Sequence, residues 1–507
     1  MNSFEMLFNG FIAALTIDNL FVCLIGTLVG TLVGVLPGLG PASAIAILLP
    51  LTTVLEPQQG IIMLAGIYYG SQYGGSTTSI LLNIPGEASS VATCIDGYPM
   101  AKAGRAGPAL GIAAIGSFIA GSLGVVGLCF FAPFFAEYSL KFGPPEYFAL
   151  MILSLSIIIN FSGQSVTKGL IMGLCGYALS TIGLGPISGR PRFTLGLNCL
   201  QSGIETVSMI IGLLAIKEVI RGLEETQVAI AGENVGSVFP SKEDMKRSIG
   251  PILRGGVIGF LLGLLPGCAP SVSTFLSYDV EKKLSKHPEE FGKGAIEGVA
   301  GPESANNANG SAAFIPLLSF GIPCTAPMAM LLVGLMIYGI QPGPTLFQQT
   351  DGFVWVVIAS MFIGNLMLLV LNLPLVGLWA KITRIPYGIL GPIILMLCVV
   401  GSYTLRNRIF DVVVSLVFGV IGYFLSKYRF PVVPMILMFI LGPQLERSFV
   451  QSMAMSHDNI LIFFTRPISA VILAGTVVLI AISVRLMIRT KKRLKDVSGV
   501  DMDVSDD

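Results

Sequence analysis

The chain has 507 residues, of which 53% are hydrophobic and only 12% are charged, and its formal net charge is +1. Because a soluble globular protein contains about 25% charged residues, this composition excludes an ordinary soluble domain and predicts a chain that crosses a lipid membrane many times. The near-neutral net charge favours no nucleic-acid partner.

The first half of the chain, residues 1–220, begins with an apolar helix that we expect over about residues 19–36. This helix stops at a Leu-Pro-Gly sequence, residues 36–38, and a second proline follows at Pro41. Because proline lacks the backbone N–H and glycine tolerates unusual backbone conformations, we predict a broken helix here. The apolar stretch Ala42–Leu55 is shorter than the roughly 20 residues that cross a membrane, and we interpret it as half of a re-entrant hairpin.

Small and hydroxyl side chains follow in the run Tyr73-Gly-Gly-Ser-Thr-Thr-Ser79, which leads to Ile84-Pro-Gly86. Residues 87–105 are polar, and we predict that they form a loop. The rest of this half consists of apolar segments near residues 107–135, 146–162, 166–187 and 202–220.

A hydrophilic linker, residues 221–254, separates the two halves, and its basic residues favour the cytoplasm. The second half, residues 255–490, continues with apolar segments near residues 255–265, 326–340, 353–378, 388–403, 409–426, 430–443 and 466–484. Six Lys and Arg residues lie between positions 485 and 495. We therefore expect the tail, residues 491–507, to be cytoplasmic.

The second half repeats the features of the first. Leu-Pro-Gly recurs 229 positions later, and a polar run and a second Ile-Pro follow it. We align Gly75-Ser76 with Gly310-Ser311 and Ile84-Pro85 with Ile322-Pro323, with three inserted residues. Both 1–101 and 294–380 lack Lys and Arg. An internal duplication explains these matches, so the predicted fold is an all-α polytopic membrane protein with about 12 transmembrane helices and two repeated broken-helix, or re-entrant hairpin, units.

A broken helix presents unpaired N–H groups and a positive dipole end to an anion, whereas unwound carbonyls suit a cation such as Na⁺. Matched breaks in two halves of one chain point to a transporter binding site. The residues that we expect to contact substrate are Pro37, Gly38, Gly40, Ser43, Gly74, Gly75, Ser76, Thr77, Thr78, Pro266, Gly267, Ser271, Ser273, Asn306, Asn307, Asn309, Gly310 and Ser311. Ion coupling is predicted for Asn83, Glu303 and Thr325.

Some of these residues have a structural alternative. A single Leu-Pro-Gly in a membrane helix is usually a kink, and only its duplication favours function. The three asparagines 306, 307 and 309 are also suited to hydrogen bonds between helices. Glu303 is either a partner for a proton or an ion, or a residue of a water-exposed loop.

The sequence contains no motif of a known enzyme class. Gly-x-Gly-Asp, His-Glu-x-x-His and Gly-x-Ser-x-Gly are all absent, and so is a phosphate-binding loop. The eight cysteines lie far apart and include no Cys-x-x-Cys pair, so we expect neither disulfides nor a zinc site. We predict that the protein is not an enzyme and uses no cofactor, apart from Na⁺ as a coupling ion.

Several motifs together resemble one family. They are Gly30-x-x-x-Gly34-x-x-Pro37-Gly38-x-Gly40, the run at 73–79, residues 83–86 and Gly301-Pro-Glu-Ser-Ala-Asn-Asn-Ala308. With these motifs, about residues 15–490 resemble the TctA family, the large membrane subunit of tripartite tricarboxylate transporters. The second copy departs from the first by having Cys268-Ala269 in place of Leu39-Gly40, which makes its loop less permissive.

The resemblance implies uptake of carboxylates such as citrate across a bacterial inner membrane, coupled to Na⁺ or H⁺. It also implies two partners, a small four-helix membrane subunit and a periplasmic solute-binding protein that delivers the substrate. The alternative is an anion channel or a membrane scaffold subunit without coupling.

Overall fold

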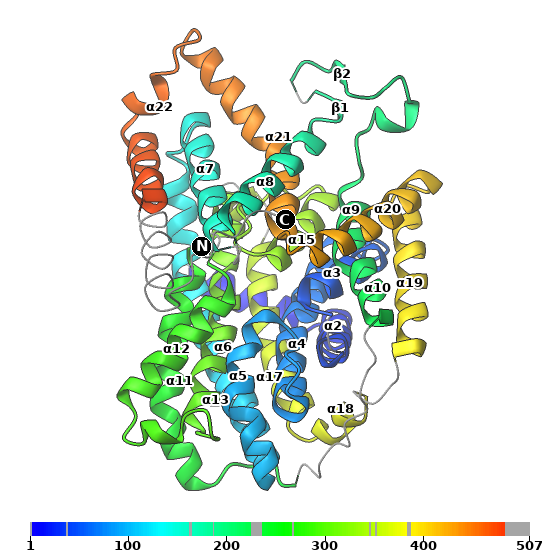
Figure 1. Ribbon diagram of the computed structural model, residues 1–507. Helices are drawn as coiled ribbons and strands as arrows, with labels where there is room; N and C mark the ends of the chain where they lie inside the picture. The colour runs from blue at the N-terminus through cyan, green and yellow to red at the C-terminus, as the bar shows by residue number, and fades with distance from the viewer. Residues whose placement is uncertain are drawn as a thin grey trace, which may run out of the picture.

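The computed structural model describes residues 3–36, 39–161, 165–185, 187–224, 236–265, 268–343, 346–349, 352–382 and 387–481, and these are almost entirely helical (Figure 1). The helices before the linker are α1 (Ser3–Ala14), α2 (Ile17–Val35), α3 (Pro41–Thr52), α4 (Pro57–Leu82), α5 (Val91–Met100), α6 (Ala106–Ser139), α7 (Pro144–Phe161), α8 (Val166–Ser180), α9 (Thr206–Ile210) and α10 (Lys217–Glu224). Short helical turns of other types are η1 (Ala88–Ser90), η2 (Ala101–Arg105), η3 (Asn198–Leu200), η4 (Ile211–Ile216) and η5 (Pro288–Glu290).

The helices after the linker are α11 (Lys242–Gly263), α12 (Pro270–Leu284), α13 (Glu297–Ala312), α14 (Phe314–Phe320), α15 (Ala326–Ile337), α16 (Leu346–Gln349), α17 (Phe353–Asn372), α18 (Val376–Ile382), α19 (Tyr387–Thr404), α20 (Ile409–Lys427), α21 (Val432–Met455) and α22 (Ile462–Thr465). A further helical segment covers Pro467–Ala481. Strands β1 (Gly183–Leu184) and β2 (Pro191–Arg192) pair antiparallel in a small hairpin.

Five helical stretches of the described residues are long and apolar enough to cross a membrane. They are Ile17–Val35, Ala88–Ser139, Phe353–Asn372, Ile409–Lys427 and Val432–Met455. Several shorter apolar helices, including α3, α8 and α15, accompany them. The all-α membrane class is therefore confirmed, and the total of about 12 crossings stays a prediction.

Both predicted helix interruptions are confirmed at their flanks. Helix α2 ends at Val35 and α3 begins at Pro41, while α11 ends at Gly263 and α12 begins at Pro270. Proline suits the first helical position, because its missing N–H would be unpaired there in any case. The four predicted site residues at the centres of the breaks, Pro37, Gly38, Pro266 and Gly267, lie outside the described residues.

Two helix pairs, α2 with α4 and α11 with α13, pack with their backbones in contact. A Cβ atom on Gly26, Gly30 or Gly34 would overlap the backbone of α4, and the same holds for Gly255, Gly259 and Gly263 against α13. Small residues at every fourth position allow this close approach. The first three glycines precede the second three by the same 229 positions that separate the two Leu-Pro-Gly sequences.

These contacts also give the register between the halves. Gly34 meets Ser71, and its counterpart Gly263 meets Asn309, which places the α4 and α13 partners 238 positions apart. The same 238 positions separate Asn83 and Gly321, which end α4 and α14 in the left-handed conformation with φ of 58° and 71°. These contacts favour an alignment of α4 with α13 that differs by three residues, close to one helical turn, from that of Gly75-Ser76 with Gly310-Ser311. The change from 229 to 238 positions then corresponds to nine extra residues between α11 and α13.

The loop predicted for residues 87–105 was also wrong, because this segment forms η1, α5 and η2. Its polar residues have partners inside the protein. The Asp96 carboxylate is fully buried and accepts N–H bonds of 2.8–2.9 Å from Gly292, Gly294 and Ala295, and the Tyr278 hydroxyl donates to its other oxygen. A polar sequence can thus form a buried helix when each polar group is paired.

Part of the predicted linker is helical as well. Helix α11 begins at Lys242, where Ser241 and Asp244 form a reciprocal capping box. Ion pairs join this end of α11 to its neighbours: Arg105 to Asp244 at 2.5 Å, Arg247 to Glu297 at 2.8 Å and Arg254 to Glu281 at 2.5 Å. We call this group of ion pairs, together with the Asp96 contacts, the linker-end cluster; α5, α11, α12 and α13 gather there at the lower end of Figure 1.

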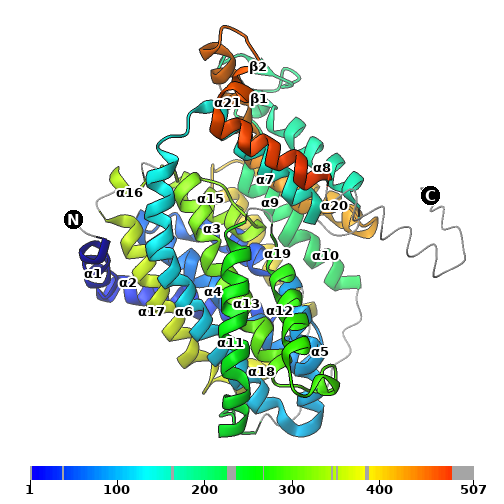
Figure 2. The ribbon, with the colours of Figure 1, turned by 90° about the vertical axis from the view of Figure 1, so that its left-hand side faces the viewer.

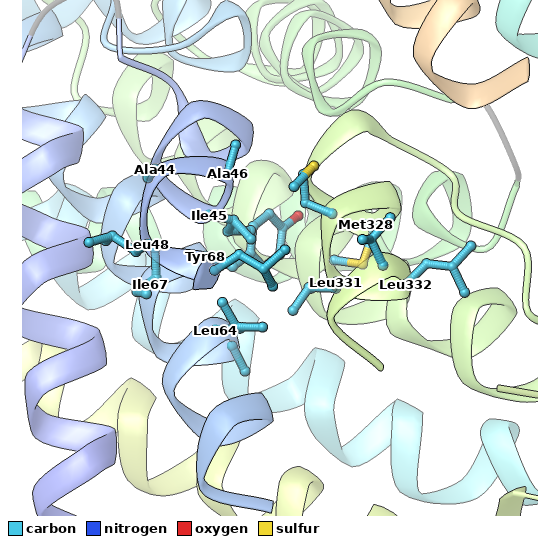
Figure 3. Packing of buried hydrophobic residues seen from close by; sticks show 14 of the residues in the cluster. Ala44, Ile45, Ala46, Leu48, Leu64, Ile67, Tyr68, Met328, Leu331 and Leu332 are labelled. Carbon is cyan, nitrogen blue, oxygen red and sulfur yellow. The ribbon is translucent and has the colours of Figure 1, made fainter. Parts of the chain in front are cut away.

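Helices α3, α4 and α15 pack against one another through apolar side chains. Figure 3 shows side chains of α3, α4 and α15 meeting there, with Tyr68 between Ile45 and Met328. These residues are almost completely buried. Helix α3 is thus held against α4 and α15, whereas α12 packs against α11 and α13.

Candidate functional site

Polar side chains from both halves meet where α4 passes α13, and neither helix contains a Lys or Arg residue. Helices α5 and α6 pack against α13 at the same place, as Figure 2 shows for α6. The polar runs at 71–79 and 304–311, which were noted in the sequence, therefore lie inside helices. We call this region the central polar cluster; its members are Gln72, Ser76, Glu87, Thr93, Ser117, Glu303, Ser304, Asn306, Asn307 and Asn309.

Glu303 lies at the centre of this cluster and is only 1% exposed. Ser76 donates a hydrogen bond of 2.6 Å to one carboxylate oxygen, and the Thr93 hydroxyl donates to the other. The hydroxyl of Ser117 lies beside the same carboxylate. Of the two interpretations that the sequence left open for Glu303, the water-exposed loop is excluded by its position in α13.

A second carboxylate, Glu87, lies nearby and is partly buried at the start of η1. Asn306 donates to it at 2.9 Å, and a Cβ on Gly75 would lie 3.5 Å from its side chain. None of the ion pairs within the described ranges involves Glu87 or Glu303. A buried carboxylate without a cationic partner is costly at membrane depth, so the cluster is suited to take up a proton or a cation.

Two of the three asparagines use their amide donors within the protein. Asn306 donates to Glu87, and Asn307 donates to Ser117 at 2.7 Å and to the backbone oxygen of Glu303 at 3.1 Å. The interpretation of these side chains as contacts between helices is therefore confirmed for Asn306 and Asn307. Their side-chain oxygens have no partner in the described structure, and the fully buried Asn309 has none for either polar atom.

Unpartnered acceptors dominate the cluster. Besides the three asparagine oxygens, the buried Gln72 side-chain oxygen and the Ser304 hydroxyl also lack partners among the described residues. Buried polar atoms are nearly always hydrogen-bonded, so several orphaned oxygens in one place indicate a position for a ligand or water. Because most are acceptors without a free donor, they suit a cation better than the anion that the sequence suggested for the asparagines.

The remaining predicted residues divide between this cluster and local structural roles. Ser311 adjoins it on α13, since its hydroxyl donates to the backbone oxygen of Asn307 at 3.2 Å. Gly310 lies beside Gln72 and Tyr68, where a side chain would not fit. Gly74 packs against the α2 backbone at Thr31, so it serves helix packing and is not open to a ligand as predicted.

Hydroxyl and cap residues outside the cluster make local bonds. Thr78 and Ser273 donate to backbone oxygens of their own helices, at Gly75 and Pro270. Thr325 caps α15 through Met328, and Asn83 is exposed where α4 ends. The positions beside the two breaks are Gly40, with open space around it, the buried Ser43 and the half-buried Ser271.

A small cavity of about 10 Å³ adjoins the central polar cluster, which is roughly the space that one water molecule occupies. Its polar lining comes from Tyr73, Ser76, Thr77, Ser117 and Asn372. A second hollow of about 380 Å³ lies toward the linker, lined by residues 236–239 and 373–377. Residue Val376 lines both spaces.

Several residues of this region were not predicted as site residues from the sequence. Glu87 and Thr93 were assigned to a loop, whereas Ser117 and Asn372 are single polar residues in apolar segments. The signal for the latter two was present, because a polar residue in an apolar membrane helix usually faces the protein interior.

The chain was compared with known proteins. The model of the tripartite tricarboxylate transporter TctA family matches residues 20–437. An uncharacterized 52.8 kDa protein in the TAR-I ttuC' 3'region of Agrobacterium vitis is 46% identical over 484 residues, which cover 95% of this chain and 96% of that protein. An uncharacterized protein in the TAR-II ttuC' 3'region of the same organism is 45% identical over 234 residues, 46% of this chain and 97% of that protein.

No solved structure shows significant similarity to the chain. The family match covers most of the sequence, from α2 to the first part of α21. A family of membrane transporter subunits is consistent with the helical architecture and the apolar helices described above. The chain belongs to the tripartite tricarboxylate transporter TctA family.

Proposed function

We propose that this protein is the large transmembrane subunit of a binding-protein-dependent secondary transporter that takes up citrate-like tricarboxylates or related organic acids by symport with Na⁺ or H⁺. The observation that carries this proposal is Glu303, a buried carboxylate at the contact of the two halves with hydroxyl partners and no cationic one. The proposed substrate class follows from family membership, and the proposed coupling to an ion follows from the Glu303 carboxylate.

The two halves of the chain suit two different ligands. The starts of α3 and α12 follow the helix breaks, and their N–H groups and dipoles favour an anionic substrate. Such a site needs no buried Lys or Arg, which would cost about 2.5–3.5 kcal/mol at a helix centre. The central polar cluster, rich in oxygen acceptors, is left for the coupling ion.

We also propose that the halves are related by internal duplication. The glycine contacts of α2 with α4 and of α11 with α13 follow one pattern and support this relation. Transporters built from repeats commonly move one part against the other around a fixed site. A rearrangement of these two helix pairs would expose the central polar cluster to each side of the membrane in turn.

Membrane location and partners follow the family. We place the chain in a bacterial inner membrane with a small four-helix subunit and a periplasmic binding protein that delivers the substrate. The linker-end cluster and the basic residues of α11 and α12 favour the cytoplasmic side at that end. The same rule places the C-terminal tail in the cytoplasm.

Uptake into proteoliposomes tests the proposal. The chain is reconstituted with its small partner, binding protein is added outside, and labelled di- and tricarboxylates are compared with and without Na⁺ or pH gradients. Accumulation above the outside concentration only with a gradient is the expected result. Equilibration without accumulation indicates an uncoupled channel, and absence of flux from folded protein indicates a scaffold.

A further inference from the structure

We propose that the small cavity lined by α4, α6 and α17 binds one Na⁺ ion beside Glu303, with oxygen ligands from Ser76, Ser117 and Asn372. This inference rests on the proposed function, because it assigns the coupling ion to a particular site. It adds two residues, on α6 and at the end of α17, that the polar motifs of the two halves do not contain.

Asn372 supplies the independent observation that the cavity holds a ligand. Its side chain lines the cavity and is only 7% exposed. Its amide nitrogen donates to the backbone oxygen of Leu368 at 2.9 Å, so the nitrogen is satisfied and the oxygen has no partner in the described structure. An orphaned amide oxygen at the wall of a small cavity is an expected ligand for a hard cation.

The other polar groups at the cavity wall also offer oxygen. Ser76 and Ser117 line the cavity and contact Glu303, so they connect its carboxylate to the empty space. The Ser117 hydroxyl oxygen accepts a hydrogen bond of 2.7 Å from Asn307, which uses one of its two lone pairs and leaves the other for a ligand. Tyr73 donates its hydroxyl proton to Asn365 at 2.7 Å and therefore presents oxygen to other neighbours.

The single carboxylate beside the cavity and the small volume of the cavity favour a monovalent ion. The cavity adjoins one carboxylate, and one Na⁺ would neutralise it without leaving a net buried charge. Ca²⁺ needs six to eight oxygen ligands and Mg²⁺ usually keeps several waters, whereas about 10 Å³ accommodates a single water-sized species. Within the described ranges, no group of three acidic, His or Cys residues offers a divalent site.

A second hollow lies next to the cavity. Val376 lines both spaces and therefore stands between the cavity and the larger hollow beside linker residues 236–239. Val238 closes this hollow against α6, since its backbone oxygen lies where a side chain on Gly111 would be. An ion could enter this hollow from the cavity only if the Val376 side chain moved.

Direct binding of ²²Na⁺ to the purified full-length chain in lipid nanodiscs tests the site without substrate. Choline replaces Na⁺ to hold the ionic strength constant, and K⁺ serves as the competitor of equal charge. We expect saturable binding of one Na⁺ per chain. Asn372→Ala and Ser117→Ala should each weaken binding about 10- to 100-fold.

Ser360→Ala is the matched control, because Ser360 is buried on the same helix α17 but donates only to the backbone oxygen of Val357. It should bind Na⁺ like the wild type. Asn372→Asp keeps the oxygen and the shape of the side chain, so it should retain Na⁺ binding. If Asn372→Ala does not fold, Ser117→Ala and Asn372→Asp decide the question.

The outcomes separate this site from the proposed function. Unaltered Na⁺ affinity in Ser117→Ala and Asn372→Ala overturns the site. Absence of Na⁺ binding by a protein that still accumulates carboxylate with a pH gradient overturns the site and keeps the transporter. Na⁺ binding that depends on Asn372, in a protein without uptake, supports the site and contradicts the proposed function.

Discussion

Two of the regions that contain buried carboxylates, the linker-end cluster and the central polar cluster, differ in their surroundings. In the linker-end cluster, Glu281 and Glu297 pair with Arg254 and Arg247, and Asp96 accepts three backbone N–H groups. In the central polar cluster, Glu303 and Glu87 receive only neutral hydroxyl and amide donors. The first arrangement holds helices together, whereas the second contains carboxylates without a cationic partner among the described residues, which is the basis of the proposed ion site.

The largest effect is expected for Glu303→Gln. Glutamine keeps the size of the side chain but removes the charge, so ion coupling should be lost while folding is retained. We expect uptake to fall at least about 100-fold, which corresponds to roughly 3 kcal/mol for a lost charged interaction. The rate of uptake into proteoliposomes with equal amounts of protein measures this loss. Unchanged coupled uptake by Glu303→Gln would show that Glu303 does not differ in function from the paired carboxylates of the linker-end cluster.

Asp96→Ala should instead reduce the amount of folded protein and leave the transport rate of the folded molecules nearly unchanged. It removes the acceptor of three N–H groups, of which that of Ala295 is buried, and leaving a buried donor unpaired costs about 1–3 kcal/mol. We expect a loss of folded protein, measured as the monodisperse fraction after heating in detergent. The molecules that remain folded should transport at a nearly normal rate, and a specific defect in transport per folded molecule would count against a structural role for Asp96.

A third prediction concerns the backbone contacts of α11 with α13. Gly259→Ala places a methyl group onto the backbone of Ala305, and overpacking of this kind costs about 1–3 kcal/mol. Gly256 lies on the same helix, where an added Cβ meets only Ala120 at 3.4 Å, an ordinary contact. Gly256→Ala should therefore be neutral or stabilising by up to about 1 kcal/mol, and equal melting temperatures for the two variants would contradict the close packing.

The smallest expected effect is a pH dependence of the stability of the fold that comes from Asp244 in the linker-end cluster. Burial opposes ionisation of Asp244, but hydrogen bonds from Ser241 and Arg105 prevail and hold the pKa of Asp244 below its usual value. Because the folded-state pKa is the lower one, the ionised carboxylate stabilises the fold above the unfolded pKa of about 3.9 and loses this effect as the pH falls through the folded value.

Asp244→Asn tests this dependence. The variant should melt slightly earlier than the wild type at pH 7, and the difference should shrink as the pH is lowered from about 5 toward 3. Melting in detergent followed by tryptophan fluorescence is a sufficient measurement. A difference that grows at low pH would mean that Asp244 is stabilised in its protonated form.

Much of the architecture was accessible from the sequence. The apolar composition predicted the helical membrane class, and each Leu-Pro-Gly predicted where a helix stops, because proline and glycine act on the backbone at their own positions. Family membership followed from the same local motifs. The spacing of Gly26, Gly30 and Gly34 was also present in the sequence, although its role in packing was not recognised.

The pairing of distant residues was decided only by the tertiary structure. Residues 87–105 look like a loop because they are polar, yet Asp96 finds its partners 196 to 199 positions away and the segment becomes a buried helix. Glu303 meets Ser76 and Thr93 in the same way. Helix propensity and hydrophobicity are local properties, whereas the cost of burying a charge depends on groups that packing brings together. Local sequence therefore determined where the helices break, and tertiary packing determined which carboxylates are paired with a cation and which have only neutral partners.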